Sequence, residues 1–550
     1  MAHTVPAATA TDVRWRQWLA AVALFLVGLG LYSIDLDKPP RFDELYHVLG
    51  ARGYLEHGEP RIAEGVYERA RYFTATIALV FSTFGESVAV GRLPAVLCGS
   101  LLVTLLFLWV RSVAGQTAAW FAAIAFLISP FAAHVSQDIR FYAPFALFFW
   151  LGAMAVYAAS TAERPSMAHL AWLTVGAAVC LGIALYLQDL TLIGVVGLGL
   201  WLGVQVGWPW LRAPPARYAR ITVALAVGAV AVVILAQIWT PSELLLRYRQ
   251  TPLWNADTRN HFWYYHQWLN LYYPTLWPLF PLAALAALAH RPRPALFCLC
   301  IFVVGFLLLS FAGPKSLLYA TFILPFLFVL WGMAFAYVWA RLRGFVLEVT
   351  DGGLRGLGVP TSTALKTVLI AATVGFILLA NTALIRTATM LAGIAVPPEL
   401  PTSRWWDAAE SLEPWLTQAA VVITASDLQA LYYFGDYDIL IDKSRLSEGP
   451  ASGDEFGRDR RTGHPIVSTP KSIDRIIDCF PDGLIVTDKP RWRHPEHLDD
   501  ATADLIVRRT EPIPLPAETR ILAFRWANGD GPRSEACADL EQLVRPDRRG

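Results

Sequence analysis

Long apolar runs dominate the first 390 positions of the chain and alternate with short polar breaks. Most runs hold about 17–25 residues, enough for a helix to cross a bilayer core of ~30 Å. The apolar stretch 73–84 is too short to cross, and we expect it at the interface or as a re-entrant piece. Apolar length and charged breaks together predict about eleven spans. They cover residues 18–36, 88–110, 117–135, 141–159, 168–187, 190–210, 221–239, 271–289, 295–312, 316–340 and 367–385.

The first run follows Arg14 and Arg16, a pattern that a signal peptide would also show. No small-x-small cleavage site follows it, and Asp35 and Asp37 come next instead. An uncleaved first span is therefore the better interpretation.

Positive charges divide the connections between spans into two groups. With the N-terminus inside, the short outer connections hold only Arg140 and Lys315, and this asymmetry predicts a cytoplasmic N-terminus. Two longer outer loops, about 37–87 and 240–270, also carry cations. Anionic ligands such as phosphate would explain those cations, and so would loop length and nearby acids. The inner cations are Arg111, Arg164, Arg212, Arg217, Arg220, Arg291, Arg293, Arg341, Arg343, Arg355 and Lys366.

An odd number of spans places residues 397–550 on the outer face of the cell membrane. Strand-like AVVIT leads into SDLQALYYFG, which has the pattern of an N-capped helix. DYDILI, the helical SIDRIIDCF, the strand GLIVT and later DLIVRR and RILAFRW follow. This alternation predicts a small three-layer α/β unit, and no glycine-rich loop suggests a nucleotide. The predicted fold is an all-α membrane domain over 1–396 with a small extracytoplasmic α/β domain over 397–550.

Composition supports the membrane interpretation and adds one exclusion. The chain is 55% hydrophobic and only 16% charged, with a mean hydropathy of +0.44, too apolar for a soluble protein of this size. Its 21 Trp and 19 Tyr are the aromatics that settle at membrane interfaces. The formal net charge of +1 offers no electrostatic argument for a nucleic-acid partner.

Two of the six cysteines fall in the predicted outer domain. Cys479 and Cys537 on an oxidising side predict a disulfide, with two separate thiols as the alternative. The other four lie in predicted spans, where a free cysteine behaves as a small hydrophobe. They are Cys98, Cys180, Cys298 and Cys300.

Polar islands interrupt the apolar pattern on the predicted outer side. RFDE at 41–44 sets Asp43 beside Glu44, and adjacent carboxylates near a bilayer are costly unless they are solvated or paired. A solvated loop start or a helix cap is the structural alternative. The other two islands follow later spans. They are SQDIRFY, with Asp138, Arg140 and Tyr142, and GPKSLLY, with Lys315 and Tyr319.

Each later island also has a structural alternative. The first could be a helix cap with an interfacial tyrosine, and Lys315 could be a cation that snorkels to the interface. All three islands share one face under the predicted orientation. That convergence of acids and cations favours a functional site.

As an ordered set, the motifs resemble the membrane-embedded C-type glycosyltransferases that use polyprenyl-phosphate sugars. This family includes protein O-mannosyltransferases and the bacterial transferases that modify lipid A or other envelope glycans. The resemblance is good over about the first 160 residues, and further along it rests on topology. The motifs are FDELYH (42–47), FGESVAVGRLPAVLCG (84–99), GQTAAWFAA (115–123), ISPF (128–131) and SQDIRFYA (136–143).

The resemblance implies roles for several of these residues. Asp43 corresponds to the catalytic aspartate of the first loop and Asp138 to the second acidic position. Arg140 and Tyr142 match an arginine-x-tyrosine pattern. These matches imply a mostly helical transferase with its site on the outer side.

The resemblance also implies carrier-phosphate contacts, with two departures. Arg69 or Arg71 stands where relatives place a basic residue beside prolines, and those prolines are absent here. Lys315 and Tyr319 resemble a lysine-x-x-arginine-tyrosine signature, but Leu318 occupies the place of the arginine.

The expected chemistry needs one base and several cations. A sugar phosphate carries a good leaving group, so Asp43 as base and Lys315 with Arg140 at the phosphate would suffice, with inversion at the anomeric carbon. Asp138 would hold the acceptor or orient a cation. Contacts to acceptor or sugar are assigned to Glu44, Tyr142, Tyr319 and His261.

No cofactor is firmly implied, although a divalent metal is compatible with the sequence. His261 and His266 stand five apart and would point to different faces of a helix, which argues against a metal pair. The aromatics around them are more typical of an interfacial belt than of a sugar platform.

The expected partners are a polyprenyl-phosphate-linked sugar, membrane lipid, and an envelope glycan, lipid or protein as acceptor. The first alternative is a transporter or flippase of lipid-linked saccharides, which should show internal repeats and broken midplane helices. The sequence shows no repeat, and its charges collect at one face, which favours the enzyme. The second alternative, a silent membrane scaffold, is disfavoured by Asp43 and Asp138.

Overall fold

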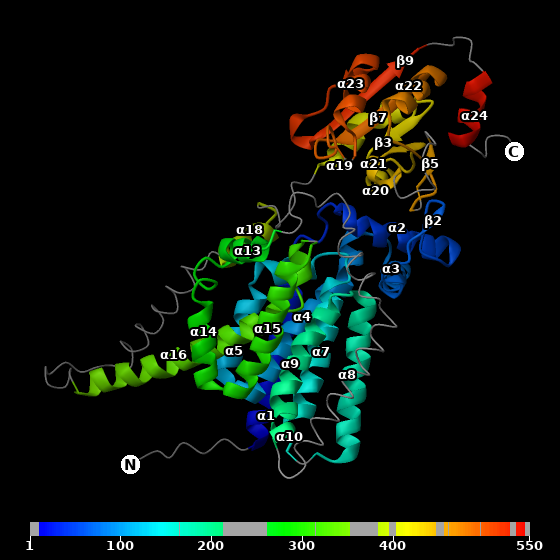
Figure 1. The fold of residues 1–550 in the computed structure, drawn as a ribbon. Helices are drawn as coiled ribbons and strands as arrows, with labels where there is room; N and C mark the ends of the chain where they lie inside the picture. The colour runs from blue at the N-terminus through cyan, green and yellow to red at the C-terminus, as the bar shows by residue number, and fades with distance from the viewer. Residues whose placement is uncertain are drawn as a thin grey trace. The chain divides into compact units, whose positions relative to one another are not determined.

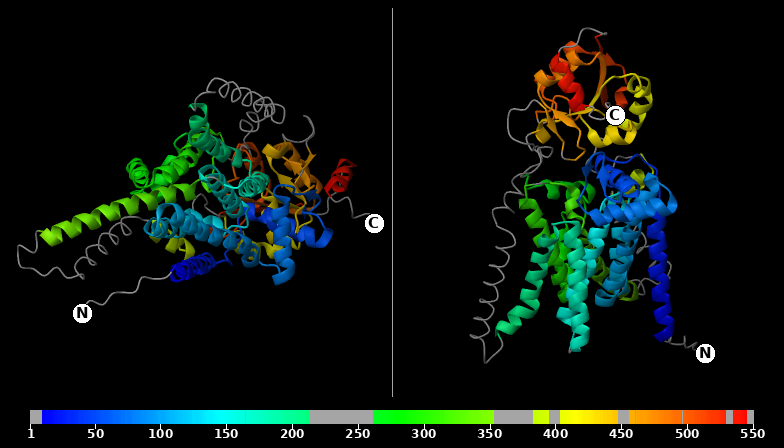
Figure 2. Two further views of the ribbon diagram at one scale, coloured as in Figure 1. Left: turned by 90° about the horizontal axis from the view of Figure 1, so that it is seen from below. Right: turned by 90° about the vertical axis from the view of Figure 1, so that its right-hand side faces the viewer.

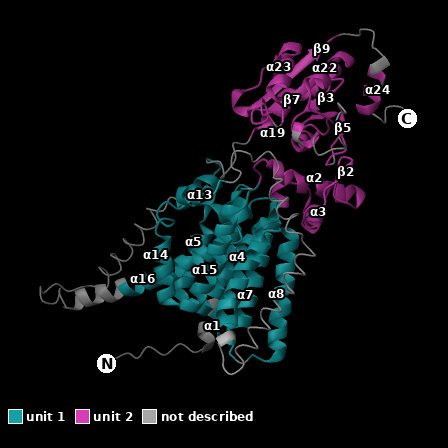
Figure 3. Ribbon diagram, in the orientation of Figure 1, with its two compact units in different colours: residues 1–36, 92–251, 257–399 teal, residues 37–91, 252–256, 400–550 magenta. Residues whose placement is uncertain are grey.

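The computed structural model describes residues 10–212, 261–352, 383–394, 403–446, 456–528 and 535–544, apart from residues 164, 314, 460 and 496. The chain divides into two compact units (Figure 3). Unit 1 comprises residues 1–36, 92–251 and 257–399, and unit 2 comprises 37–91, 252–256 and 400–550. The first outer loop thus clusters with the C-terminal region rather than with the membrane helices.

Unit 1 is a bundle of apolar helices. Among the described residues, six helices are long and apolar enough to cross a membrane. A seventh span results if α5 (Gln116–Leu127) and α6 (Pro130–Ser136), bent by 62°, count as one. The six are α4 (Val88–Ala114), α7 (Tyr142–Thr161), α8 (Met167–Leu187), α9 (Thr191–Leu202) continued to Trp210, α15 (Pro292–Phe311) and α16 (Leu324–Gly352) as far as Arg341.

The predicted count of eleven spans is not confirmed. Residues 221–239 and most of 367–385 lie outside the described part of the chain. The predicted spans 18–36 and 271–289 correspond to short apolar helices, namely Trp18–Tyr32 and Phe280–His290. The remaining described helices of unit 1 are α1 (Ala10–Tyr32), α10 (Trp208–Arg212), α13 (Tyr264–Tyr272), α14 (Phe280–His290) and α18 (Ala383–Leu391).

A proline explains why the helix in the predicted span 316–340 begins later than the apolar run does. The helix α16 begins at Leu324, and the 3₁₀ turn η3 (Leu317–Ala320) precedes it. Pro325 stands in the first turn of α16, where its missing N–H costs nothing. Further along a helix its ring would clash with the carbonyl one turn earlier, so the helix cannot extend far upstream.

Small residues let the helices of unit 1 approach closely, and the ribbon views show them running side by side (Figures 1 and 2). A Cβ at Gly332 of α16 would lie 2.5 Å from the carbonyl oxygen of Ala118 in α5. A Cβ at Gly197 of α9 would lie 2.8 Å from the Cα of Ile301 in α15. Close backbone packing at small residues is how helices associate in a lipid environment.

Unit 2 is built on one mixed sheet, in which the strands run in the order β5-β6-β4-β3-β7-β9-β8. The central four, from β6 to β7, are parallel, and the outer ones are antiparallel to their neighbours. Apolar residues fill the central strands because helices pack on the sheet. The strands are β3 (Val422–Thr424), β4 (Ile439–Ile441), β5 (Gly457–Arg458), β6 (Pro465–Val467), β7 (Asp482–Asp488), β8 (Glu511–Ile513) and β9 (Ile521–Ala527).

The predicted α/β character is present, and the structure also shows the type of the segment DLIVRR. DLIVRR lies in the helix α23 (Asp500–Arg509), although it has the composition of a strand. The Asp499 carboxylate caps that helix by accepting the N–H of Thr502 at 3.0 Å. Ala503 and Ile506, three residues apart, are both buried, which is a helical period. The other helices are α19 (Trp405–Leu416), α20 (Asp427–Tyr433), α21 (Lys443–Leu446), α22 (Pro470–Cys479), η5 (Ala517–Thr519) and α24 (Glu535–Val544).

Residues 42–84 form a small subdomain of the same unit. It holds α2 (Phe42–His57), the strands β1 (Arg61–Ile62) and β2 (Gly65–Val66), and α3 (Arg71–Phe84). Leu45 and Leu49 of α2 share a buried apolar cluster with Leu428 and Leu440 of the sheet region. The first-loop helix is therefore part of the core of the C-terminal domain.

The helix α3 contains the stretch predicted to lie at an interface or to re-enter. Its 14 residues are too few to cross a bilayer core. Phe73, Ile77 and Phe81 are buried on one side, whereas Leu79 and Phe84 are exposed. One side of α3 thus packs on the protein and the other exposes apolar residues, and its place at the interface or as a re-entrant piece stays a prediction.

Cys479 at the end of α22 and Cys537 in α24 form a disulfide across 58 positions, with their Cα atoms 5.2 Å apart. Both lie in an apolar cluster, together with Leu540 and Val544 of α24. The disulfide therefore ties the last described helix to the sheet.

The disulfide predicts a pattern of thiol reactivity and a loss of stability. We expect Cys479 and Cys537 to react with an alkylating reagent only after reduction, in protein whose other four cysteines are replaced by serine. Exchanging the pair for serine should lower the free energy of unfolding of the C-terminal unit by about 2–4 kcal/mol. Mass spectrometry after alkylation, and denaturant titration, measure the two effects. Alkylation of both thiols in native, unreduced protein would contradict the bond.

Candidate functional site

Side chains of unit 1 close the end of its first helix. The Gln137 amide, from the second polar island, donates to the carbonyls of Tyr32 at 3.1 Å and Ile34 at 2.6 Å. The guanidinium of Arg92 donates to the carbonyl of Leu36 at 2.7 Å. Both side chains are buried, and they satisfy the last carbonyl of α1 and two carbonyls of the segment that follows it. This part of the island has a structural role.

Asp138 and Arg140 lie in the turn between α6 and α7, Tyr142 is the first residue of α7, and all three are buried. The backbone N–H of Arg140 donates to the carbonyl of Asp138 at 2.7 Å. The Arg140 guanidinium carbon lies 5.1 Å from the ring centre of Phe141 and 5.8 Å from that of Tyr142. A buried acid and a buried cation are thus held within one turn by aromatic neighbours.

Lys315, from the third island, caps α15. Its ammonium group donates to the carbonyls of Leu309 at 2.9 Å, Ser310 at 2.7 Å and Ala312 at 2.5 Å. The side chain is only 2% exposed, and burial lowers the pKa of Lys315 from 10.5 to about 8. A cation near the C-terminus of a helix also interacts favourably with the helix dipole. The group is therefore a positive charge held in a fixed place.

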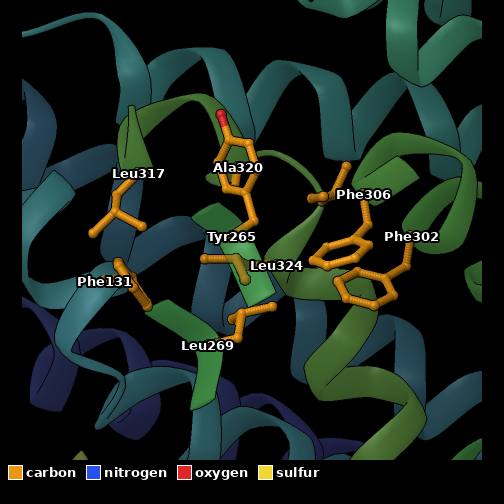
Figure 4. Close-up of a pocket in the computed structure, with 9 residues that line it drawn as sticks. Phe131, Tyr265, Leu269, Phe302, Phe306, Leu317, Ala320 and Leu324 are labelled. Atoms are coloured by element: carbon orange, nitrogen blue, oxygen red, sulfur yellow. The ribbon is translucent and has the colours of Figure 1, made fainter. Parts of the chain in front are cut away.

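An apolar pocket lies beside this lysine in unit 1 (Figure 4). It is a shallow apolar depression with an enclosed volume of only about 10 Å³, and Tyr265, which lines it, also lies close to the cation. The Tyr265 ring centre is 5.7 Å from the Lys315 ammonium nitrogen, and its hydroxyl donates to the carbonyl of Ser316 at 3.1 Å. The lining side chains come from α6, α13, α15, η3 and α16. They are Phe131, Tyr265, Leu269, Phe302, Phe306, Leu317, Ala320, Ile323 and Leu324.

Asp43 and Glu44 stand in the first turn of α2, in unit 2, and differ in environment. Glu44 is 1% exposed and accepts the backbone N–H of Arg41 at 2.8 Å, which closes the helix N-terminus. Asp43 is exposed. Of the two adjacent acids, Glu44 has a capping role, and Asp43 presents its carboxylate at the surface of the unit.

The other predicted residues have more ordinary surroundings. Arg69 and Arg71 are exposed, and Arg71 donates to the Tyr54 hydroxyl at 2.9 Å. His261 and Tyr319 are half-buried in unit 1, and Tyr319 lies in η3. Within the described residues no three His, Cys, Asp or Glu side chains gather as a metal site. Metal dependence and the sugar contacts of these residues stay predictions.

A buried ion-pair network, which the sequence did not suggest, occupies the C-terminal ends of the parallel strands in unit 2. Asp427 follows β3, is 1% exposed, and lies 2.7 Å from Arg445 and 3.2 Å from Arg461. Burial alone would raise the pKa of Asp427, but the two guanidinium groups outweigh it and hold that pKa well below its usual range. Asp459 also contacts Arg445, at 3.3 Å.

The comparisons with known proteins agree with this architecture. Residues 70–235 match the family model described as dolichyl-phosphate-mannose-protein mannosyltransferase. Among curated proteins, no sequence matches the chain. Apo ArnT from Cupriavidus metallidurans is similar in structure, with a TM-score of 0.55 and 17% identity over 95% of this chain and 100% of ArnT.

Two further structures show the same similarity. ArnT from Cupriavidus metallidurans bound to undecaprenyl phosphate gives a TM-score of 0.55 and 16% identity over 96% of this chain and 100% of that one. The oligosaccharyltransferase AglB from Archaeoglobus fulgidus, in complex with an inhibitory peptide and a dolichol-phosphate, gives 0.54 and 13% over 87% and 70%. This protein has the GT-C glycosyltransferase fold. The resemblance inferred from the motifs is confirmed, and the GT-C chain is a multi-pass membrane protein.

Sequence reasoning about this GT-C chain missed the network because its members are scattered. The segment SDLQ suggested an N-capped helix, and Ser426 does stand at the N-cap position of α20, but its side chain makes no capping hydrogen bond. Nothing in the sequence marked Asp427 as buried. The signal that could have found it is the position of an acid directly after a buried parallel strand, where ligand and ion sites concentrate in α/β sheets.

The network predicts a pH-dependent effect on stability. Asp427→Ala removes the buried carboxylate that Arg445 and Arg461 share, while Arg445 keeps Asp459 at 3.3 Å. We therefore expect a loss in the free energy of unfolding at pH 7 that is smaller than the about 3–5 kcal/mol of a fully uncompensated buried charge. A carboxyl with a lowered pKa stabilises the fold above its unfolded pKa of 3.8, and that stability is lost as the pH falls toward its folded pKa. The difference between wild type and variant should therefore shrink below about pH 4. Denaturant titration at pH 7 and pH 3 tests this, with the exposed Asp500→Ala as control. An equal difference at both pH values would contradict the role assigned to Asp427.

Proposed function

We propose that this protein transfers a sugar from a polyprenyl-phosphate carrier to an acceptor hydroxyl on the outer side of the cell membrane. The observation that carries the proposal is the buried ammonium group of Lys315, held in a fixed place beside apolar side chains of α13, α15 and η3. A polyprenyl phosphate needs apolar surface for its tail and a positive charge for its head, and Tyr265 links the apolar depression to the Lys315 ammonium group. The GT-C fold and the similarity to ArnT bound to undecaprenyl phosphate support the same carrier class.

Lys315 would act at the phosphate by its charge more than by direct hydrogen bonds. Its donors already serve three carbonyls of α15, so it need not reorganise when a phosphate arrives. A fixed charge aimed at the place where negative charge develops is an effective form of electrostatic catalysis. Arg140, equally buried, is the second cation that we assign to the leaving phosphate.

The reaction follows from the acid–base inventory. The acceptor oxygen attacks the anomeric carbon and its proton passes to the Asp43 carboxylate, while the bond from the anomeric carbon to the phosphate oxygen breaks. The electron pair leaves with the phosphate, which needs no general acid. A single displacement of this kind inverts the anomeric configuration. Asp138 is assigned to the acceptor or to the orientation of Arg140.

Native mass spectrometry of the purified protein is the first test of the carrier. A copurified polyprenyl-phosphate sugar supports the proposal and identifies the sugar. Retention of lipid-linked saccharide without transfer to any acceptor would instead favour the transporter.

The role of Asp43 predicts a separation of chemistry from binding. Asp43→Asn keeps size and hydrogen bonding but removes the proton acceptor, and general-base catalysis contributes ~10²–10⁴ in rate. We expect turnover to fall by that factor while carrier retention is unchanged. Transfer and carrier content are measured at matched expression, with Asp37→Asn as the control acid. Near wild-type transfer by Asp43→Asn would exclude it as the base, and Asp138 would be examined next.

Lys315 predicts a pH dependence of carrier binding. Its ammonium form, which attracts phosphate, is lost as the pH rises through about 8. The affinity for undecaprenyl phosphate should therefore be highest below pH 8 and decline above it. Lys315→Arg keeps its charge over this range and should bind without that decline. Binding titrations from pH 6.5 to 9.5 measure both proteins. The same decline in Lys315→Arg would assign the effect to another group.

A further inference from the structure

The first turn of α2, which carries Asp43, lies under two arginines of the C-terminal domain. The Arg461 guanidinium carbon is 4.5 Å from the ring centre of Tyr46, and that of Arg491 is 5.2 Å from the ring centre of Phe42. Phe42 and Tyr46 are one helical turn apart, and their ring centres are 5.9 Å apart in an edge-to-face arrangement. These two aromatic residues bracket Asp43 in the sequence.

Both arginines are anchored at the same edge of the sheet. Arg461 pairs with Asp427, after β3, at 3.2 Å. Arg491 pairs with Asp488, the last residue of β7, at 2.6 Å. The strands β3 and β7 are parallel neighbours, so the two carboxylates stand at adjacent strand ends. Neither acid is more than 4% exposed.

The arrangement is rigid at every step. Each anchor pairs a buried carboxylate with a partly exposed guanidinium group, so the attraction of the buried charge holds the arginine at the edge of the sheet. A planar guanidinium over an aromatic ring is held by both packing and charge. Tyr46 is further stacked on Tyr67, with ring centres 4.7 Å apart. The sheet therefore determines where the first turn of α2 lies.

The charges of this cluster do not suit a separate anion site. Arg461 and Arg491 each already have a carboxylate partner. Their side chains are 28% and 21% exposed, and each guanidinium group lies over an aromatic ring. These contacts support a role of the two arginines in orienting α2.

We propose that Arg461 and Arg491 are positioning residues for the transfer reaction, which hold the Asp43 carboxylate in place through Tyr46 and Phe42. The proposal rests on the proposed function of Asp43 as the base. It assigns the C-terminal α/β domain a part in catalysis, because the anchors of both arginines belong to its sheet.

The test uses the full-length protein and separates kcat from KM. Arg461→Ala leaves Asp427 with Arg445, so no buried acid is stranded. Because small misplacements of a reacting group cost up to about 10²-fold in rate, we expect kcat to fall by roughly 10- to 100-fold with KM for donor and acceptor unchanged. Arg461→Lys keeps a cation over the ring and should restore part of kcat. Arg475→Ala, which removes a guanidinium over the ring of Phe456, is the matched control.

A double-mutant cycle with Asp43→Asn gives the deciding result. If Arg461 acts through Asp43, Arg461→Ala causes no further loss of transfer in the Asp43→Asn background. Equal losses in both backgrounds, or wild-type kcat in folded Arg461→Ala, would overturn the proposal. Near wild-type transfer by Asp43→Asn alone would instead overturn the function assigned to Asp43. Should Arg461→Ala not fold, Tyr46→Phe and Tyr46→Leu ask the same question, with loss of kcat expected only in the second.

Discussion

In a membrane helix bundle, a helix-end carbonyl that is buried away from water must find a donor within the protein, because lipid offers none. Two of the polar islands, together with Arg92, meet that requirement here. Lys315 satisfies three carbonyls at the end of α15. Gln137 and Arg92 satisfy the carbonyls that follow α1. The charges and amides on which a catalytic reading of the sequence rests therefore also hold the helix ends in place.

The two roles reinforce each other at Lys315. A charge is costly to bury unless the surrounding dipoles stabilise it, and the carbonyls of α15 supply them. The same carbonyls hold the ammonium group beside Tyr265 and the apolar depression. Binding of a phosphate there would therefore cost no reorganisation free energy for this side chain. Burial still lowers its pKa to about 8, close to working pH. A residue that is structurally necessary can in this way also be tuned for an anionic ligand.

Much of the fold could be predicted from local features of the sequence. Apolar length predicted the spans around α4, α7, α8, α9 and α15, because an apolar run of this length is typical of a helix that crosses a bilayer. The predicted span 316–340 began too early, because Pro325 limits the helix upstream. The composition of DLIVRR did not reveal its type, which Asp499 decides by capping a helix there. The motifs singled out Asp43 and Lys315, but not the contact of Tyr46 with Arg461. That contact joins segments far apart in the chain, and no local pattern encodes it.

The placement of the first-loop helix links fold and chemistry. An isolated helix of 16 residues is only marginally stable in water, and α2 shows little segregation of apolar and polar sides. Its stability must come from packing, and Leu45 and Leu49 pack against Leu428 and Leu440 of the C-terminal domain. Two arginines of that domain lie over the rings of Phe42 and Tyr46 in α2. The segment carrying Asp43 and the α/β domain are therefore one folding unit, although more than 300 residues of membrane bundle separate them in the sequence.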